Sequence, residues 1–224
     1  MRQNFLKTTF LAVAFTFTIA ACEKAPSGDN AQIGEKQQAA QISGQTFIVD
    51  TAASRIRFTG HGIGKNHPGT FKLTNGTVAI QDDAITGGSF TIDIKSMQLE
   101  QQEGPIQSQL RPHLMSGDFF DAEKFGTAKF EITGVTPYSP GSSDTSVVEG
   151  ANFNVSGNFT LKGTTKNITF PARIDLDANT LKARGNFDID RRQWQMNYGN
   201  DKTLGDKFIS ETVNIELDLR AVKQ

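Results

Sequence analysis

From Thr46 onward, hydrophobic and polar side chains alternate along the chain in short runs, as expected for β-strands. The last run shows the pattern most clearly, because Val213, Ile215, Leu217 and Leu219 alternate with polar residues. Each run has one apolar and one polar face, which is typical of antiparallel strands, whereas buried parallel strands are apolar on both faces. Roughly eight such runs joined by short turns predict an all-β domain, either a sandwich or a closed barrel.

Two features within this region predict local structure. Asn75-Gly76 separates two strand-like runs, and both residues accept the positive φ of a type I′ turn, so a tight hairpin is expected there. Residues 104–115 place Ile106, Leu110 and Leu114 on one helical face, with a proline well placed for the first turn and Pro112 expected to kink or shorten the helix. A second short helix is expected around residues 118–124.

Phenylalanine dominates the aromatic residues, with 17 Phe against one Trp and two Tyr. Most lie on the apolar faces of the runs, and an eight-stranded barrel has just enough room inside for side chains or one small ligand. These phenylalanines therefore form either a packed core, which is the more ordinary explanation, or the wall of an apolar pocket. The candidate lining residues are Phe58, Phe71, Phe90, Ile92, Phe130, Phe153, Val155, Phe159 and Phe187.

The N-terminus is typical of an export signal. Arg2 and Lys7 precede an uncharged run over residues 10–21, which is too short to span a bilayer as a helix but fits the apolar core of a signal peptide. The segment Ile19-Ala20-Ala21-Cys22 resembles a bacterial lipobox. In such lipoproteins the cysteine thiol receives diacylglycerol, the signal is cut before the cysteine, and the new amine receives an acyl chain such as palmitate. The alternative is an ordinary signal peptide with a chance cysteine near its cleavage site.

These features divide the chain into three parts. Residues 1–21 are the predicted lipoprotein signal peptide, residues 22–44 a polar, flexible tether, and residues 45–224 the folded domain. As a flexible coil the tether would hold the domain on the order of 25 Å from the membrane. We expect a lipid-anchored protein of the bacterial envelope that faces the periplasm, and Glu23 after the cysteine favours the outer membrane.

Composition excludes several classes of protein. With 23 Lys+Arg against 24 Asp+Glu, the chain lacks the basic footprint of a nucleic-acid-binding protein. A single cysteine excludes an intramolecular disulfide framework and a CxxC site. The three histidines, His61, His67 and His113, equal the usual number of protein ligands of catalytic zinc, so a metal-dependent or enzyme-like role at their loops is the alternative function.

Several motifs together resemble the YceI-like family of bacterial envelope proteins. The strongest is the run from His113 to Asp121, which is similar to the family signature HLxSxDFFD and includes His113, Leu114, Ser116, Asp118, Phe119 and Phe120. The opening Phe47-Ile48-Val49-Asp50, the stretch from Gly157 to Lys166 and the segment Asp190-Arg191-Arg192-Gln193-Trp194 are also similar to family segments. The resemblance covers almost all of the predicted domain.

The resemblance implies an extended, lipocalin-like, eight-stranded antiparallel β-barrel with one or two short helices. It also implies a non-enzymatic protein that carries or sequesters a long amphiphile, such as a polyisoprenoid or a quinone-type lipid, and no other cofactor. The signature residues would mainly pack the helix against one barrel end, with contact to a ligand headgroup as a secondary role. A structural stress lipoprotein with a filled interior is a further alternative.

Overall fold

The protein is described by a computed structural model covering residues 27–62, 65–101, 103–139 and 146–224. Strands make up most of these ranges. They are β1 Asp29–Asn30, β2 Gln32–Glu35, β3 Gln45–Val49, β4 Arg55–Gly62, β5 Lys65–Gln81, β6 Ala84–Leu99, β7 Thr127–Pro137, β8 Phe153–Leu161, β9 Thr164–Leu176, β10 Thr180–Asp190 and β11 Ile209–Lys223.

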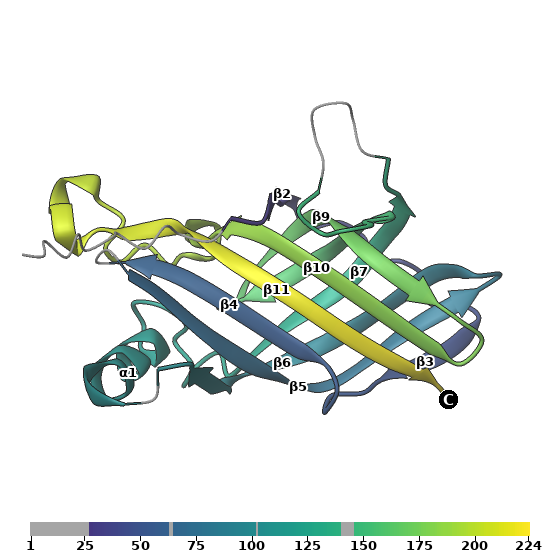
Figure 1. Cartoon of the computed structure of the whole chain (residues 1–224), viewed down its shortest axis with the longest axis horizontal. Coiled ribbons are helices and arrows are strands. Elements are labelled where there is room, and N and C mark those ends of the chain that lie inside the picture. Colours follow the sequence, from purple (N-terminus) through teal and green to yellow (C-terminus); the bar gives the residue numbers. More distant parts are fainter. Residues whose placement is uncertain (1–26, 63–64, 102, 140–145) are drawn as a thin grey trace, which may run out of the picture.

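The strands close into one elongated antiparallel barrel (Figure 1). From β5 to β11 each strand pairs with the next in sequence, and β11 pairs in turn with β3 and β4. Because β3 and β4 lie one after the other between β11 and β5, the wall has eight strand positions. The predicted eight-stranded, lipocalin-like antiparallel barrel is therefore confirmed.

The alternation read from the sequence explains which side chains face inward. On β6, Phe90, Ile92 and Ile94 are buried, while Thr91 and Asp93 between them are more exposed. A strand of this kind buries every second side chain, so the sheet closes around its apolar face.

The predicted hairpin at Asn75-Gly76 is wrong, because both residues lie inside β5 and pair with β6. Gly76 serves close packing instead, since a Cβ there would lie 2.8 Å from the Cβ of Phe90. The turn between β5 and β6 lies at Asp82 and Asp83, whose φ angles are 52° and 61°. Aspartate tolerates this left-handed conformation, so the pair makes the turn.

The predicted helix is present as a π-helical turn, η1 Ile106–Leu110, that continues into α1 Arg111–Met115. Pro112 does not break it, because it lies in the first turn of α1, where its missing N–H is tolerated. The second helix expected around residues 118–124 is wrong: this stretch forms consecutive turns, with hydrogen bonds from Asp121 N to Ser116 O and from Phe125 N to Asp121 O. Two short 3₁₀ helices, η2 Arg191–Trp194 and η3 Lys202–Lys207, precede β11.

The flexible tether predicted over residues 22–44 is wrong for its described part from Gly28 onward. β1 pairs with β10 and β2 pairs with β9, so this segment fills the seam where β9 and β10 separate. Further along, the backbone N–H groups of Gln37 and Ala40 bond to β8 and β7. The segment is polar because it lies on the outer wall, and its backbone hydrogen bonds order it where composition alone indicates a coil.

The signal peptide, the lipobox with Cys22, and Glu23 lie outside the described residues. Within the described ranges, none of the helices combines the length and the apolar character needed to cross a bilayer.

Candidate functional site

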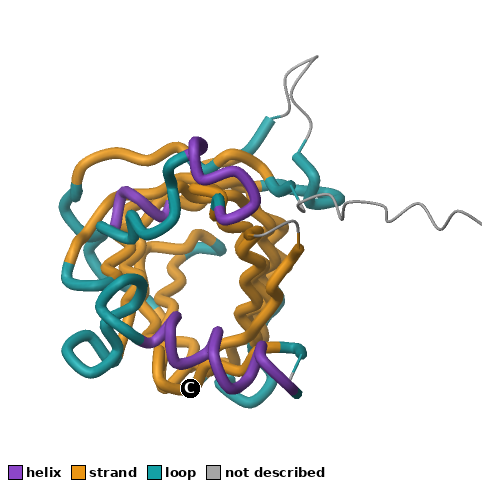
Figure 2. The backbone as a smooth tube through the Cα atoms, turned by 90° about the vertical axis from the view of Figure 1, so that its left-hand side faces the viewer, coloured by secondary structure: helices purple, strands orange, loops and turns teal. Residues whose placement is uncertain are grey.

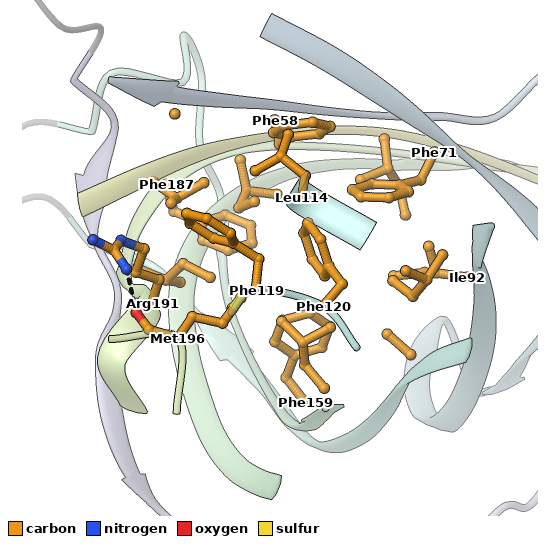
Figure 3. A pocket seen from close by; sticks show the side chains of 18 of the residues that line it. Phe58, Phe71, Ile92, Leu114, Phe119, Phe120, Phe159, Phe187, Arg191 and Met196 are labelled. Carbon is orange, nitrogen blue, oxygen red and sulfur yellow. Dashed lines mark hydrogen bonds between the residues drawn. The ribbon is translucent and has the colours of Figure 1, made fainter. Parts of the chain in front are cut away.

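The short helix α1 lies at one end of the barrel (Figures 1 and 2). The barrel encloses an apolar cavity of about 180 Å³, which Leu114 of α1 helps to line. Side chains from the wall strands, from η1 and α1, and from the turn after α1 line it (Figure 3). Apolar side chains and two glycines make up nearly all of the lining, and the polar exceptions are His61, His67, Arg191 and Ser210.

Most of the predicted lining residues face this cavity. Phe58, Phe71, Phe90, Ile92, Phe130, Phe159 and Phe187 all line it. Val155 instead lines a second, smaller cavity of about 50 Å³ farther along the barrel. Phe153 lines neither cavity and packs, partly buried, against the hydrophobic core. The interior is thus both a packed core and a pocket wall, with the open space concentrated at one end.

Three residues of the signature motif contribute to the cavity from the α1 end. Leu114, Phe119 and Phe120 line it, and Phe120 meets Phe71 edge-on with 5.5 Å between ring centroids. The backbone N–H groups of Phe119 and Phe120 bond to the carbonyls of Ser116 and Leu114, which holds the backbone of both residues against the helix. These contacts support the interpretation of the motif as a cap on the barrel end.

The polar residues of the motif hold the cap together. His113 Nε2 lies 3.0 Å from Asp118 Oδ2, and Ser116 Oγ donates to the His113 carbonyl oxygen at 2.7 Å. The His113 ring also packs edge-on against Phe119 and Tyr198. Because the Ser116 hydroxyl bonds to a backbone carbonyl and not to the imidazole, the three residues are arranged as a structural clasp and not as a nucleophile with its base.

Arg191 is the charged side chain of the lining, and it is only 2% exposed. Its guanidinium donates to four backbone carbonyls, those of Met196, Tyr198, Ile209 and Ser210. Burial lowers the pKa of Arg191, since the charged form loses its hydration. In the sequence, Arg191 stands out only as part of a segment that is similar to the family. Its burial distinguishes it in the structure, and the sequence does not show that burial.

The three histidines do not converge on one site. His61 and His67 lie on the paired strands β4 and β5, and His61 Nδ1 lies 2.8 Å from Asn66 Oδ1. His113 is engaged with Asp118 at the cap. Among the described residues, no group of three or more His, Cys, Asp or Glu side chains could hold a metal ion. The metal-dependent alternative therefore finds no support in the geometry.

The geometry defines a class of protein, a small closed β-barrel with an apolar internal cavity capped by a short helix. A family model described as the YceI-like domain matches residues 47–221. The chain belongs to the YceI-like family.

Related sequences and structures agree with this assignment. A UPF0312 protein of Vibrio vulnificus (strain YJ016) is 29% identical over 131 residues, which is 57% of this chain and 62% of that relative, or less than two thirds of its length. A UPF0312 protein of Pseudomonas fluorescens is 27% identical over 158 residues, 70% of this chain and 73% of the relative.

Two solved structures share the fold. The crystal structure of Burkholderia cenocepacia BcnA covers 77% of this chain and 99% of its own, at 22% identity and a TM-score of 0.60. A domain from Saccharophagus degradans, described as polyisoprenoid-binding and implicated in plant cell wall breakdown, covers 80% of this chain and 99% of its own at 15% identity and a TM-score of 0.58.

Proposed function

We propose that this protein is a lipid-binding envelope lipoprotein whose barrel holds the apolar chain of an isoprenoid-like amphiphile. The observation that carries the proposal is the cavity, whose wall is apolar except at His61, His67, Arg191 and Ser210. The likeness to a domain described as polyisoprenoid-binding agrees with it. The proposal is for a binding protein, because a wall that is almost entirely apolar suits the burial of a hydrocarbon chain.

Burial of the chain supplies the binding energy. Each methylene group transferred from water into the cavity is worth about 0.8 kcal/mol, so a few isoprene units offset the cost of association without a polar anchor. The cavity of about 180 Å³ is smaller than the roughly 300–1,000 Å³ common for ligand pockets. A long chain therefore enters only if lining side chains move. We expect the partly exposed cap residues Leu114 and Phe120 to move, because they lie on the short helix and the turn after it and not on the paired strands of the wall.

The lipid anchor would bring the barrel close to its cargo. Gly28 N donates to Asp188 Oδ1, two residues before β10 ends at the α1 end of the barrel. The six residue steps from Cys22 to Gly28 span at most about 20 Å. An acylated Cys22 would therefore hold the α1 end near the membrane surface, which fits a protein that takes up or stores a membrane lipid.

Native mass spectrometry of the chain from residue 27 onward tests lipid binding. We expect the purified domain to carry a lipid that organic extraction removes. The delipidated domain should then bind an added polyprenyl alcohol with a stoichiometry of one to one. Phe120→Trp, which adds volume at the cap, should reduce uptake, while Phe153→Trp, outside both cavities, should not. A domain that returns no lipid and takes up none would show that the interior is only structural.

A further inference from the structure

The interior of the barrel holds two separate cavities in line. The larger lies toward α1, and the smaller lies farther along, toward the turn between β5 and β6. Four side chains line both cavities: Phe90, Phe130, Phe170 and Leu217. These side chains, which we call the partition, stand where one cavity ends and the other begins.

The rings of the partition form a row of neighbouring aromatic side chains across the interior. Phe90 and Phe130 are stacked with 5.2 Å between centroids, and Phe130 lies 6.1 Å from Phe170. Phe170 in turn stacks on Phe187 at 3.9 Å. Together with Phe187, which lines only the larger cavity, these rings come from β6, β7, β9 and β10, so the row joins strands on different sides of the barrel. Phe130 is its central member because it contacts both Phe90 and Phe170.

Two glycines make room for the partition. A Cβ at Gly157 would fall well inside van der Waals contact of the Phe130 ring, so the tip of that ring packs directly against the β8 backbone. A Cβ at Gly185 would lie 3.1 Å from Phe170. A side chain at Gly157 would displace the Phe130 ring, and a side chain at Gly185 would require Phe170 to shift slightly. At this level of the barrel the sequence therefore supplies both the large rings and the glycines that leave space for them.

We propose that Phe130 sets the length of apolar chain that the barrel accepts, by ending the binding site at the partition and closing off the smaller cavity. The inference rests on the proposed lipid binding and specifies it: the ligand has a chain that fills the larger cavity and stops at Phe130. A shorter side chain at position 130 joins the two cavities and lengthens the site.

The experiment measures affinity along a series of prenyl alcohols: geraniol, farnesol, geranylgeraniol and solanesol. Each compound is titrated into the delipidated domain and the complexes are quantified by native mass spectrometry. For the wild type, affinity should rise along the series until the larger cavity is full and then stop rising. For Phe130→Leu, affinity should continue to rise to the next longer alcohol of the series. That alcohol should bind the variant about tenfold tighter than it binds the wild type.

Matched variants separate the partition from a general loosening of the interior. Phe71→Leu removes a ring that lines only the larger cavity and should leave the length limit in place. Ala172→Val narrows the smaller cavity and should restore the wild-type limit when combined with Phe130→Leu. Phe130→Met also removes the ring, and its flexible chain adapts to the surrounding side chains, so this variant serves if Phe130→Leu does not fold.

The outcomes distinguish this inference from the function beneath it. A wild type that binds no member of the series overturns the proposed lipid binding and this inference with it. If the wild type binds but Phe130→Leu leaves its length limit unchanged, the role of the partition alone is overturned. The same holds if Phe130→Leu and Phe71→Leu shift the limit equally.

Discussion

At the α1 end of the barrel, Arg191 connects the backbone after η2 to the start of β11. It contributes hydrogen bonds to four carbonyl oxygens, and its guanidinium lies 5.7 Å from the centroid of Phe119. Carbonyl dipoles stabilise the buried cation, and the cation in turn satisfies carbonyl acceptors in the loop after η2 and at the start of β11. The residue thus fixes one side of the cavity.

Replacing this guanidinium should destabilise the fold. We expect Arg191→Met to lower the free energy of unfolding by about 2–4 kcal/mol, because four acceptors lose a charged donor while part of the side-chain volume is kept. Arg192→Gln is the control, since Arg192 pairs with Asp190 at the surface and should contribute less than about 1 kcal/mol. Urea unfolding measures the free energy of unfolding of both variants. Equal losses would show that the buried hydrogen bonds of Arg191 do not stabilise the fold.

Gly157 gives a second test at the scale of single residues. Gly157→Ala should cost about 1–3 kcal/mol, because the added methyl overlaps the Phe130 ring. Combining it with Phe130→Leu should relieve part of this cost, which a double-mutant cycle detects as non-additivity. Gly134→Ala on β7, where a Cβ would meet no atom within 4 Å, is the control and should be nearly neutral. Strict additivity would contradict the packing described for the partition.

Among the structural elements, the N-terminal segment with β1 and β2 has a role that its sequence did not predict, since its strands pair with β9 and β10. β9 and β10 pair directly only over Ala172–Leu176 and Leu181–Gly185. Beyond that, β1 and β2 occupy the seam. Asn158, only 1% exposed, fastens the segment by accepting from Gln37 N and donating to Gln37 O. A free strand edge is prone to pair with other chains, so the segment also protects the barrel.

Removing this segment should loosen the seam without unfolding the barrel. A chain starting at residue 37 should exchange the amide hydrogens of residues 166–169 and 187–188 roughly tenfold faster than a chain starting at residue 27. Strands β5 and β6, on the far wall, should be unaffected. Unchanged protection at the seam would show that β1 and β2 only rest on the surface.

Two of the errors of sequence interpretation, both about structural elements, share a cause. Asn75-Gly76 has the composition of a turn, but β5 runs through it because Gly76 packs against Phe90 and Val49. Residues 28–43 have the composition of a tether, but the seam offers their backbone partners. In both cases contacts with residues distant in sequence override the local preference, and a single sequence does not reveal such contacts. The helix was predictable because its apolar face is local.

For the whole molecule, strict alternation was enough to predict an antiparallel all-β domain, and the family motifs selected the barrel. Alternation also identified inward-facing residues such as Phe58 and Phe187, because a strand's two faces are fixed by its period. It did not distinguish Phe159, which lines the cavity, from Phe153, which does not. That difference depends on where along the barrel the interior is left open, which follows from packing and not from periodicity.

The predicted anchor is tested on the complete chain in a bacterial host. Cys22→Ser should move the protein from the membrane fraction to the soluble fraction, because no diacylglycerol is then attached. Ser27→Ala, a change of similar size just downstream, should remain with the membrane. A Cys22→Ser protein that stays in the membrane fraction with unchanged mass would show that the lipobox interpretation is wrong.

The central claim is that an apolar chain binds inside the barrel at the α1 end, and photo-crosslinking with a diazirine-bearing prenyl alcohol tests it most directly. Peptide mass mapping of the labelled domain should place the label on residues that line the larger cavity, such as Phe58, Ile92 and Phe120. Unlabelled farnesol should compete it away. Label found instead on exposed apolar residues such as Ile42 and Val147, or label that excess farnesol leaves in place, would contradict the claim.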